Sequence, residues 1–386
     1  MAAHRMQVAD RIGACLPTEL RARVPQAPID LAGDVVPDRA GPVAVAAARA
    51  ALDAGETHYT DRPGVGRLRA ALAADIGERH GVELRADNVV VSSGALEGAF
   101  AAAWVALHGQ PDAAMLLPDP AHPALPRLAR LAGGSVQRVA TSPHARFRVT
   151  ADAVERACRA GGRLLLMGSP DAASGAAVEP GELAAIGDLA ERHDLVVVLD
   201  ESIARLAGPG ATVATLRDAP RLADRTVVLG SFSHDAGLSS WRVGYFAATV
   251  EAFARMRSLK QALSICSPSV SQYAALGALP TLAERAARRA AALQGRADAF
   301  TAPLAAAGWP VVRPDVPAFV WVDVASVGLD GGIALERLRG VGVGGRRGEA
   351  FGQAAAGWLR FTMADEAAAM AEAAVRVGDA LGRRAA

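Results

Sequence analysis

Lysine is almost absent from this chain. Of the 41 basic residues among 386, only Lys260 is a lysine, so a single side-chain amine is available for covalent attachment of a cofactor. A composition rich in alanine and arginine is enough to explain this shortage, which is therefore no evidence of function. Basic and acidic residues nearly balance, at 41 against 40. This balance predicts neither nucleic acid nor an anionic membrane surface as a partner.

Cysteines and long apolar runs are also scarce. Cys15, Cys158 and Cys266 stand far apart without a C-x-x-C spacing, which predicts neither a disulfide framework nor a zinc site. No apolar run approaches the roughly 18 residues of a membrane span, and no apolar stretch follows the first basic residues. We therefore expect no metal site, no membrane span and no signal peptide, with the cytoplasm as the default location. A hydrophobic content of 51% with 21% charged residues indicates a globular protein, long enough for two joined domains.

Two stretches predict strands that end at functional residues. Residues 195–203, LVVVLDESI, form an apolar run that ends in acid at Asp200. Such a run fits a strand buried on both faces of a parallel sheet, with function at its carboxyl end. Residues 88–97, NVVVSSGALE, predict a strand, a turn of small residues and a helix. A turn of this kind exposes backbone N–H groups at a helix N-terminus and is a natural phosphate seat. The candidates for that seat are Ser93, Gly94 and Ala95.

A family resemblance rests on residues 229–245, LGSFSHDAGLSSWRVGY. This stretch resembles the cofactor-anchoring loop of the class I/II aminotransferases, the fold-type I pyridoxal-phosphate (PLP) enzymes. The family pattern is Ser-x-Ser-Lys-x-x-Gly-x-x-x-x-Arg-x-Gly, and its lysine forms an imine with the cofactor aldehyde. Here the lysine position holds His234, whose imidazole has no primary amine and cannot form that bond. The matching positions are Ser231, Ser233, Gly237, Arg242 and Gly244.

Further blocks resemble the same family, in the expected order, over roughly residues 25–375. Tyr59 begins a Tyr-x-x-x-x-Gly-x-x-x-Leu-Arg block. The resemblance implies that its hydroxyl crosses a homodimer interface to the partner's cofactor phosphate, beside Ser231 and Arg242. His122 takes the place of an aromatic residue that stacks on the pyridine ring. The ordinary alternatives are a loop aromatic for Tyr59 and a surface-turn histidine for His122.

The acid and the carboxylate clamp of the family also have counterparts. Asp200 matches the carboxylate that pairs with the pyridine nitrogen and makes the ring an electron sink. Arg360 matches the arginine that binds the substrate α-carboxylate, a task that suits guanidinium geometry. Gly33 lies in a segment that, in the family, passes over the active site and leaves room for substrate. The alternatives are a buried helix-capping aspartate and a solvent-facing strand arginine.

Departures from the family pattern cluster around the cofactor's aldehyde carbon and phenolic oxygen. Ala172 replaces an asparagine, and Ile203 replaces a tyrosine, that contact the phenolic oxygen in the family. Lys260 lies 26 residues beyond His234, past another predicted strand. We expect it to be an exposed helix residue that does not reach the cofactor.

The resemblance implies an α/β protein of PLP fold type I. We expect a large domain with a mostly parallel, seven-stranded-type sheet, a small α+β domain, and a homodimer. Residues 1–40 should join the small domain, residues 41–275 should form the large cofactor-binding domain, and residues 276–386 should form the C-terminal small domain.

Three functions remain open. The first is an enzyme that acts on an α-amino or α-keto acid with noncovalently bound PLP or pyridoxamine phosphate (PMP), with His234 as acid or base. Elimination, dehydration, racemisation and half-transamination would all be possible, because an unperturbed imidazole pKa of about 6.5 suits proton transfer. The second is cofactor-free acid–base chemistry on a carboxylate held by Arg360. The third is a non-catalytic binding protein. Retention of Asp200 favours the first, because that acid has little use without a pyridine nitrogen.

Overall fold

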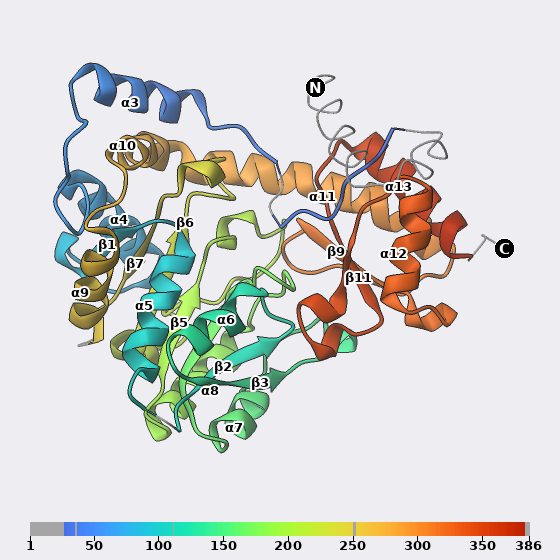
Figure 1. Cartoon of the computed structure of the whole chain (residues 1–386), viewed down its shortest axis with the longest axis horizontal. Coiled ribbons are helices and arrows are strands. Elements are labelled where there is room, and N and C mark those ends of the chain that lie inside the picture. The colour runs from blue at the N-terminus through green and yellow to red at the C-terminus, as the bar shows by residue number, and fades with distance from the viewer. Residues whose placement is uncertain (1–26, 35–36, 111, 250–251, 383–386) are drawn as a thin grey trace.

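The computed structural model describes residues 27–34, 37–110, 112–249 and 252–382, and it contains two packed bodies (Figure 1). The larger body surrounds a seven-stranded sheet and the smaller one a four-stranded sheet. In the large sheet β7 is antiparallel to both of its neighbours, and the strands from β6 to β3 run parallel. The α/β fold with a mostly parallel seven-stranded sheet is therefore confirmed. In spatial order the strands are β1 (Val89–Ser92), β7 (Gly244–Ala247), β6 (Thr226–Ser231), β5 (Val196–Asp200), β4 (Gly162–Gly168), β2 (Ala114–Asp119) and β3 (Ser135–Ala140).

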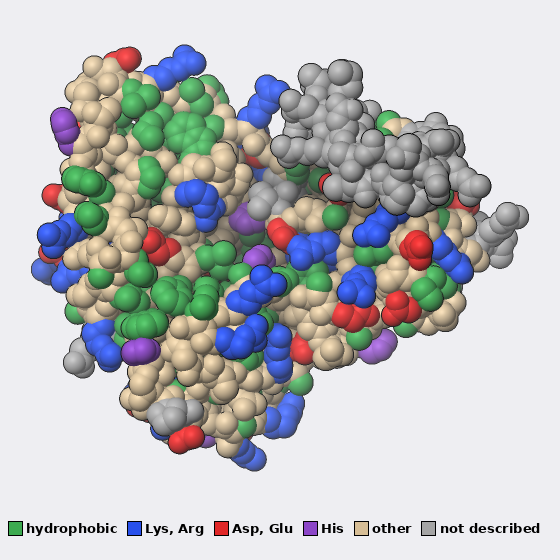
Figure 2. Space-filling model, in the orientation of Figure 1, with side chains coloured by type: hydrophobic (Ala, Val, Ile, Leu, Met, Phe, Trp, Pro, Cys, Tyr) green, Lys and Arg blue, Asp and Glu red, His purple; other side chains and the backbone are tan. Residues whose placement is uncertain are grey.

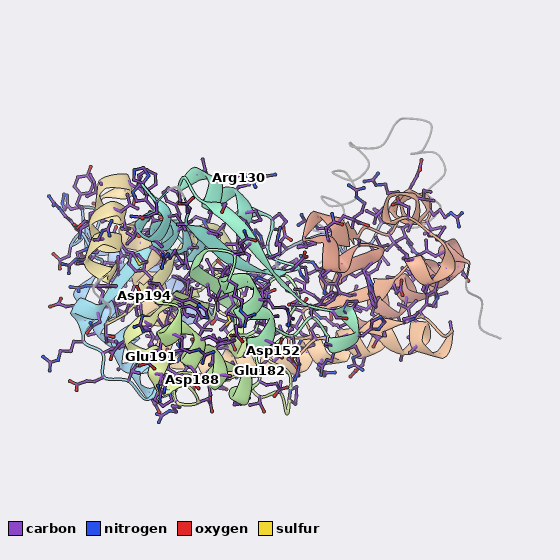
Figure 3. The ribbon with its side chains drawn as sticks, turned by 90° about the horizontal axis from the view of Figure 1, so that it is seen from below. Arg130, Asp152, Glu182, Asp188, Glu191 and Asp194 are labelled. Carbon is purple, nitrogen blue, oxygen red and sulfur yellow. The ribbon has the colours of Figure 1, made fainter. Side chains whose placement is uncertain are left out.

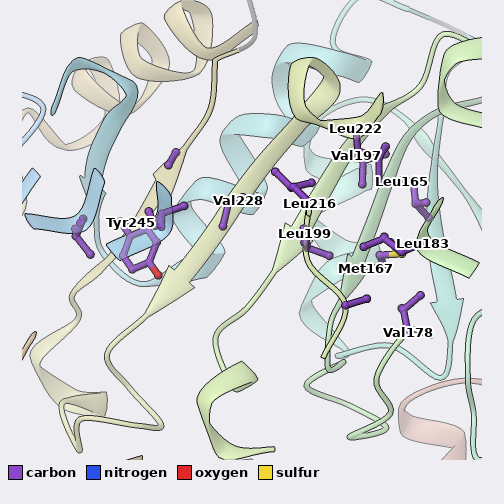
Figure 4. Close-up of a cluster of buried hydrophobic side chains, with 14 of the residues drawn as sticks. Leu165, Met167, Val178, Leu183, Val197, Leu199, Leu216, Leu222, Val228 and Tyr245 are labelled. Carbon is purple, nitrogen blue, oxygen red and sulfur yellow. The ribbon is translucent and has the colours of Figure 1, made fainter. Parts of the chain in front are cut away.

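Alternate residues of each strand face different hydrophobic cores, because side chains point to opposite faces of a sheet. Leu164 and Leu166 of β4 pack on the face that α5 covers, whereas Leu165 and Met167 pack on the opposite face (Figure 4). The strands are thus buried on both sides, as their continuous apolar runs predict. The helices of this body are α3 (Pro42–Asp53), α4 (Gly66–His80), α5 (Ala95–Leu107), α6 (Ala124–Leu131), α7 (Ala151–Cys158), α8 (Pro180–Arg192), α9 (Ala252–Ser264) and α10 (Ser269–Ala278).

Several carboxylates belong to α7 and α8, among them Asp152, Glu182, Asp188 and Glu191 (Figure 3). Arginines offset part of this charge, since Arg221 pairs with Asp188 and Glu191. Glu182 instead accepts the backbone N–H of Ala151 at the start of α7, at 2.6 Å. Glu182, Asp188 and Glu191 are thus each engaged by a neighbouring residue of the fold.

The smaller body is an antiparallel sheet backed by helices. Its strands are β10 (Arg346–Arg347), β11 (Trp358–Thr362), β9 (Phe319–Asp323) and β8 (Val311–Val312), in that order. Its helices are α12 (Gly331–Gly340) and α13 (Ala367–Leu381). Ile29 pairs with Val343 in an isolated bridge, so a segment preceding α3 also belongs to this body. The long helix α11 (Leu282–Ala306) runs between the bodies, with Leu282 in the core of the larger and Leu304 in the core of the smaller. No helix in the described ranges is long and apolar enough to cross a membrane.

Asp119 joins the two bodies at the end of β2. Its carboxylate oxygens accept the backbone N–H groups of Gln353 and Ala354, both at 3.2 Å. The N–H of Ala121 donates to the carbonyl oxygen of Phe351 at 3.0 Å. A Cβ atom at position 352 would lie 1.7 Å from Asp119 Oδ1, which explains why Gly352 occupies it. The loop that carries Phe351 is therefore fixed to the carboxyl end of β2.

Candidate functional site

A cavity of about 410 Å³ opens where β4, β5 and β6 end. Parallel strands place their carboxyl ends at one edge of a sheet, which is where ligands bind in open α/β folds. Histidine and arginine side chains gather along the junction of the two bodies on this face (Figure 2). Among the residues that line the cavity are Asp34, Ala95, Leu96, His122, Asp171, Ala172, Asp200, Ser202, Ser231, Ser233, His234, Ser239, Ser240 and Arg242. The volume falls within the roughly 300–1,000 Å³ of small-molecule sites.

Most of the site residues expected from the sequence meet in or beside this cavity. Ser93 and Gly94 lie against Arg242, and Gly33 lies against Arg360. Tyr59 does not line the cavity and is 82% exposed. The expected residues that do line it are Ala95, His122, Asp200, Ser231, His234 and Arg242.

Asp200 lies at the last position of β5 and keeps one carboxylate oxygen available. Its Oδ1 accepts hydrogen bonds from the backbone N–H and the hydroxyl of Ser202, at 2.9 and 2.5 Å. Its Oδ2 has no hydrogen-bond partner among the described residues. Burial raises the pKa of Asp200, and the Ser202 hydrogen bonds act in the opposite direction. The arrangement suits a cationic or N–H-bearing partner in the cavity, which would favour the ionised carboxylate.

His234 is a neutral imidazole at pH 7. Burial lowers its pKa to about 4, and the nearby cations of Arg289 and Arg360 act in the same direction. The pKa of His122 is also lowered, chiefly by burial. Its Nδ1 accepts the backbone N–H of Ala124 at 3.2 Å, which leaves the ring proton of the neutral form on Nε2. His234 is therefore available as an unprotonated imidazole at neutral pH, and its burial disfavours the protonated form.

The residues that the sequence suggests as a phosphate seat lie around Arg242. Its Nη1 and Nη2 donate to the carbonyl oxygens of Ser239 and Ser93, both at 3.0 Å. Gly94 has φ +85°, and a Cβ atom there would lie 2.3 Å from Arg242 Nη2, so only glycine fits. Ser93 differs from expectation, because Glu97 Oε2 already accepts its N–H at 2.7 Å.

The hydroxyls of the anchoring loop complete this part of the cavity. Ser231 Oγ donates to Ser233 Oγ at 2.8 Å and accepts the Ser233 N–H at 3.1 Å. Both hydroxyls line the cavity. The seat thus offers two hydroxyls, one guanidinium and the first turn of α5.

Arg360 is buried rather than facing solvent. It projects from β11 and is 1% exposed, which excludes the alternative of a surface arginine. Its guanidinium carbon lies 4.3 and 4.2 Å from the ring centres of Phe319 and Phe351. Its Nη2 pairs with Asp34 Oδ1 at 2.7 Å and donates to Gly33 O at 3.3 Å. Burial lowers its pKa to about 10, so it remains a cation at neutral pH.

Two acids with paired arginines, Asp34 and Glu201, were not expected from the sequence. Asp34 pairs with Arg360 and also with Arg346. Behind Asp200, the next residue Glu201 is buried and pairs with Arg79, and its pKa is lowered to about 2, since these charges outweigh the effect of burial. The only sequence signal for these acids is their position, since Asp34 follows Gly33 and Glu201 follows Asp200.

Two sequence expectations need revision. Lys260 is fully buried, although the sequence predicts an exposed residue. It lies on α9, which packs against α5, and burial lowers its pKa while the nearby Glu97 carboxylate opposes that change. Its amine has no hydrogen-bond partner in the described part of the chain and does not line the cavity. Ile203 packs in the core of the smaller body, whereas Ala172 does line the cavity.

The described residues contain no group of three side chains suited to a metal ion.

The chain is similar to known proteins over most of its length. A family model described as aminotransferase class I and II matches residues 29–377. Arginine–pyruvate transaminase of Pseudomonas aeruginosa is 31% identical over 349 residues, which cover 89% of this chain and 87% of that protein. Aspartate/prephenate aminotransferase of Thermus thermophilus is 29% identical over 340 residues, which cover 87% and 86%. A solved single mutant of Thermus thermophilus aspartate aminotransferase superposes with a TM-score of 0.87 at 26% identity, over 97% of this chain and 98% of that structure.

Proposed function

The chain belongs to the class I and II aminotransferase family, and from that premise we propose that it acts on an α-amino or α-keto acid with noncovalently bound PLP or PMP. The observation that carries the proposal is the position of Asp200. Its carboxylate has an oxygen without a partner among the described residues, and it lies in the same cavity as His234 and Arg242. Asp200 is half-buried, and a desolvated carboxylate is unfavourable unless a ligand supplies a partner for it.

The residues present fit such a cofactor in most respects. Asp200 would pair with the ring nitrogen, and Ser231, Ser233 and Arg242 would hold the phosphate at the N-terminus of α5. When bound, the cofactor supplies an electron sink for charge that develops on the substrate. Position 234 offers no amine, so retention depends on these polar contacts, each worth about 1.5–3 kcal/mol where a charge is involved.

His234 supplies the proton-transfer group. Because its pKa is lowered to about 4, it enters the reaction as the neutral base and accepts a proton from the substrate. Arg360 fixes the substrate carboxylate, and the two phenylalanine rings against its guanidinium limit its rotation. A base and a clamp of this kind suit elimination, dehydration, racemisation or a half-transamination.

A second candidate is acid–base chemistry on a carboxylate substrate without any cofactor. One observation favours it: much of the phosphate seat is already occupied by protein groups. Arg242 uses both terminal nitrogens on backbone carbonyls, and Glu97 takes the N–H of Ser93. A phosphate dianion would have to displace these contacts and lie near the Glu97 carboxylate.

Absorption titration of the purified protein with PLP and with PMP separates the two candidates. We expect saturable binding of one form, weakened at least about tenfold by Asp200→Asn, which corresponds to about 1.4 kcal/mol. Asp323→Asn is the matched control, because Asp323 also ends a strand and accepts a backbone N–H, from Ser326 at 2.9 Å. A new absorption band on adding one amino or keto acid from a panel would then identify the substrate. Binding of neither form would contradict the first candidate and leave the cofactor-free one.

The proposed enzyme is a homodimer in which Tyr59 reaches the partner's cofactor site. The exposure of Tyr59 supports this role. At 82% it is high for an aromatic side chain, and it leaves the hydroxyl free to cross an interface.

A further inference from the structure

Two arginines share one carboxylate beside the cavity. Arg346 on β10 and Arg360 on β11 are register partners in an antiparallel pair, so their side chains lie side by side. Their guanidinium carbons lie 4.8 and 4.2 Å from the ring centre of Phe351. Both guanidiniums contact the same oxygen, Oδ1 of Asp34, which lines the cavity. Like charges directly opposite each other on neighbouring strands repel, and Asp34 compensates that repulsion.

The two arginines differ in their access to water. The side chain of Arg360 is 1% exposed, whereas those of Arg346 and Asp34 are 27% and 40% exposed. Arg360 Nε is buried without a hydrogen-bond partner in the described part of the chain. A buried cation that loses its counter-ion is strongly destabilising. Arg360 therefore needs a carboxylate at all times, whether from Asp34 or from a ligand.

We propose that Asp34 is an internal occupant of the carboxylate clamp, and that Arg346 holds Asp34 when a ligand carboxylate replaces it on Arg360. This inference rests on the proposed function only in requiring that a carboxylate ligand enters the cavity. During the exchange the ligand pairs with Arg360 while Asp34 stays with the more exposed Arg346. Every charge thus keeps a partner. Arg346 is then a positioning residue that acts through Asp34 and not a second anchor for the ligand.

The exchange defines which ligands can enter. A ligand must compete with an intramolecular carboxylate, so a neutral carboxamide cannot replace Asp34. One carboxylate is sufficient, since Arg346 remains occupied by Asp34. The alternative is that Arg346 binds a second carboxylate of the ligand, which would favour dicarboxylates.

Calorimetric titration without cofactor tests the exchange. The probes are 3-phenylpropanoate, its neutral amide, and the dicarboxylate succinate. We expect Asp34→Asn to raise the affinity for 3-phenylpropanoate about tenfold. Arg346→Gln should lower it about tenfold in the wild-type background and leave it unchanged in the Asp34→Asn background. The matched control is Asp38→Asn, which removes a carboxylate that also bridges two arginines, Arg285 and Arg289, outside the cavity lining.

Several results would overturn the proposal. Weaker binding in Asp34→Asn would mean that Asp34 supports the clamp and does not occupy it. Equal weakening by Arg346→Gln in both backgrounds would make Arg346 a direct ligand. Absence of carboxylate binding in both the wild type and Asp34→Asn would remove the clamp altogether.

A further comparison covers the case in which Asp34→Asn does not fold. The single variant Arg346→Gln should weaken 3-phenylpropanoate and succinate by the same factor. A larger loss for succinate would overturn the exchange. Because no arm uses PLP or PMP, a protein that binds neither form but shows the exchange would refute the proposed cofactor alone.

Discussion

The stability of this protein should report the neutral state of His234. Its pKa is about 4 in the folded chain because of burial, whereas an unfolded histidine titrates near 6.5. Between these values the unfolded chain binds the additional proton, so the free energy of unfolding decreases as the pH falls. The contribution of His234 is complete above about pH 6.5 and is lost towards pH 4. Integrated from pH 7.5 to 4.5, the loss is about 2.5 kcal/mol.

Asp235, the next residue, makes the free energy of unfolding change with pH in the opposite direction. Burial raises the pKa of Asp235 to about 6, despite the opposing charge of Arg205, whereas an unfolded aspartate titrates near 3.9. The folded state therefore holds a proton that the unfolded state releases, and its stability rises as the pH falls. From pH 7.5 to 4.5 this gain is about 2 kcal/mol. In the wild type the two contributions nearly cancel.

Urea unfolding of single variants at pH 7.5 and 4.5 separates them. Relative to the wild type, His234→Gln should gain about 2.5 kcal/mol on going to pH 4.5, and Asp235→Asn should lose about 2 kcal/mol. The control is His144→Gln, which makes the same change at an exposed residue of the 3-10 helix Pro143–Ala145, outside the cavity lining. If the stability difference of His234→Gln is the same at both pH values, the imidazole is not held neutral by its site, and its role as a base loses its physical support.

Three further predictions concern Gly94, Lys260 and the oligomeric state. Gly94→Ala should destabilise the fold by about 2 kcal/mol in urea unfolding and displace Arg242, because the site requires a positive φ and the Cβ atom would overlap the guanidinium; unchanged stability would contradict the close contact. Lys260→Met should stabilise the fold by about 1–3 kcal/mol because it removes a buried amine without a partner, whereas Arg255→Met on the exposed side of α9 should change little. The native mass should be twice 39.6 kDa, and a monomeric protein with an intact site would refute the proposed role of Tyr59.

The sheet was predictable because its strands carry a continuous signal. The run before Asp200 is apolar at every position, and the run before Ser231 is polar only at Thr226, as expected of strands covered on both faces. Their ends also placed polar residues at one edge of the sheet, so the meeting of Asp200 and His234 in one cavity follows from topology. Local sequence and tertiary structure agree at these positions.

The pairing of Asp34 with Arg360 could not be read from the sequence. These residues lie 326 positions apart, and no periodic pattern relates them. Lys260 was wrongly placed because lysines are almost never fully buried, and nothing local distinguishes the inner face of α9. The hydrogen bond from the Ser93 N–H to Glu97 was easier to predict from the sequence. A glutamate in the first turn of a helix commonly accepts backbone N–H groups, and Glu97 occupies that place.

The hydrogen bonds of Asp119 make the positions of two distant parts of the sequence depend on each other. Residues 348–355 carry Phe351, the ring on which the clamp arginine rests, yet their position is set by a carboxylate at the end of β2. A chimera that imports this loop from a relative should keep its ligand preference only if it also imports the β2 end that matches it. Substrate range in this scaffold would then be transferred as pairs of segments, and single-loop grafts should yield folded proteins with a misplaced clamp.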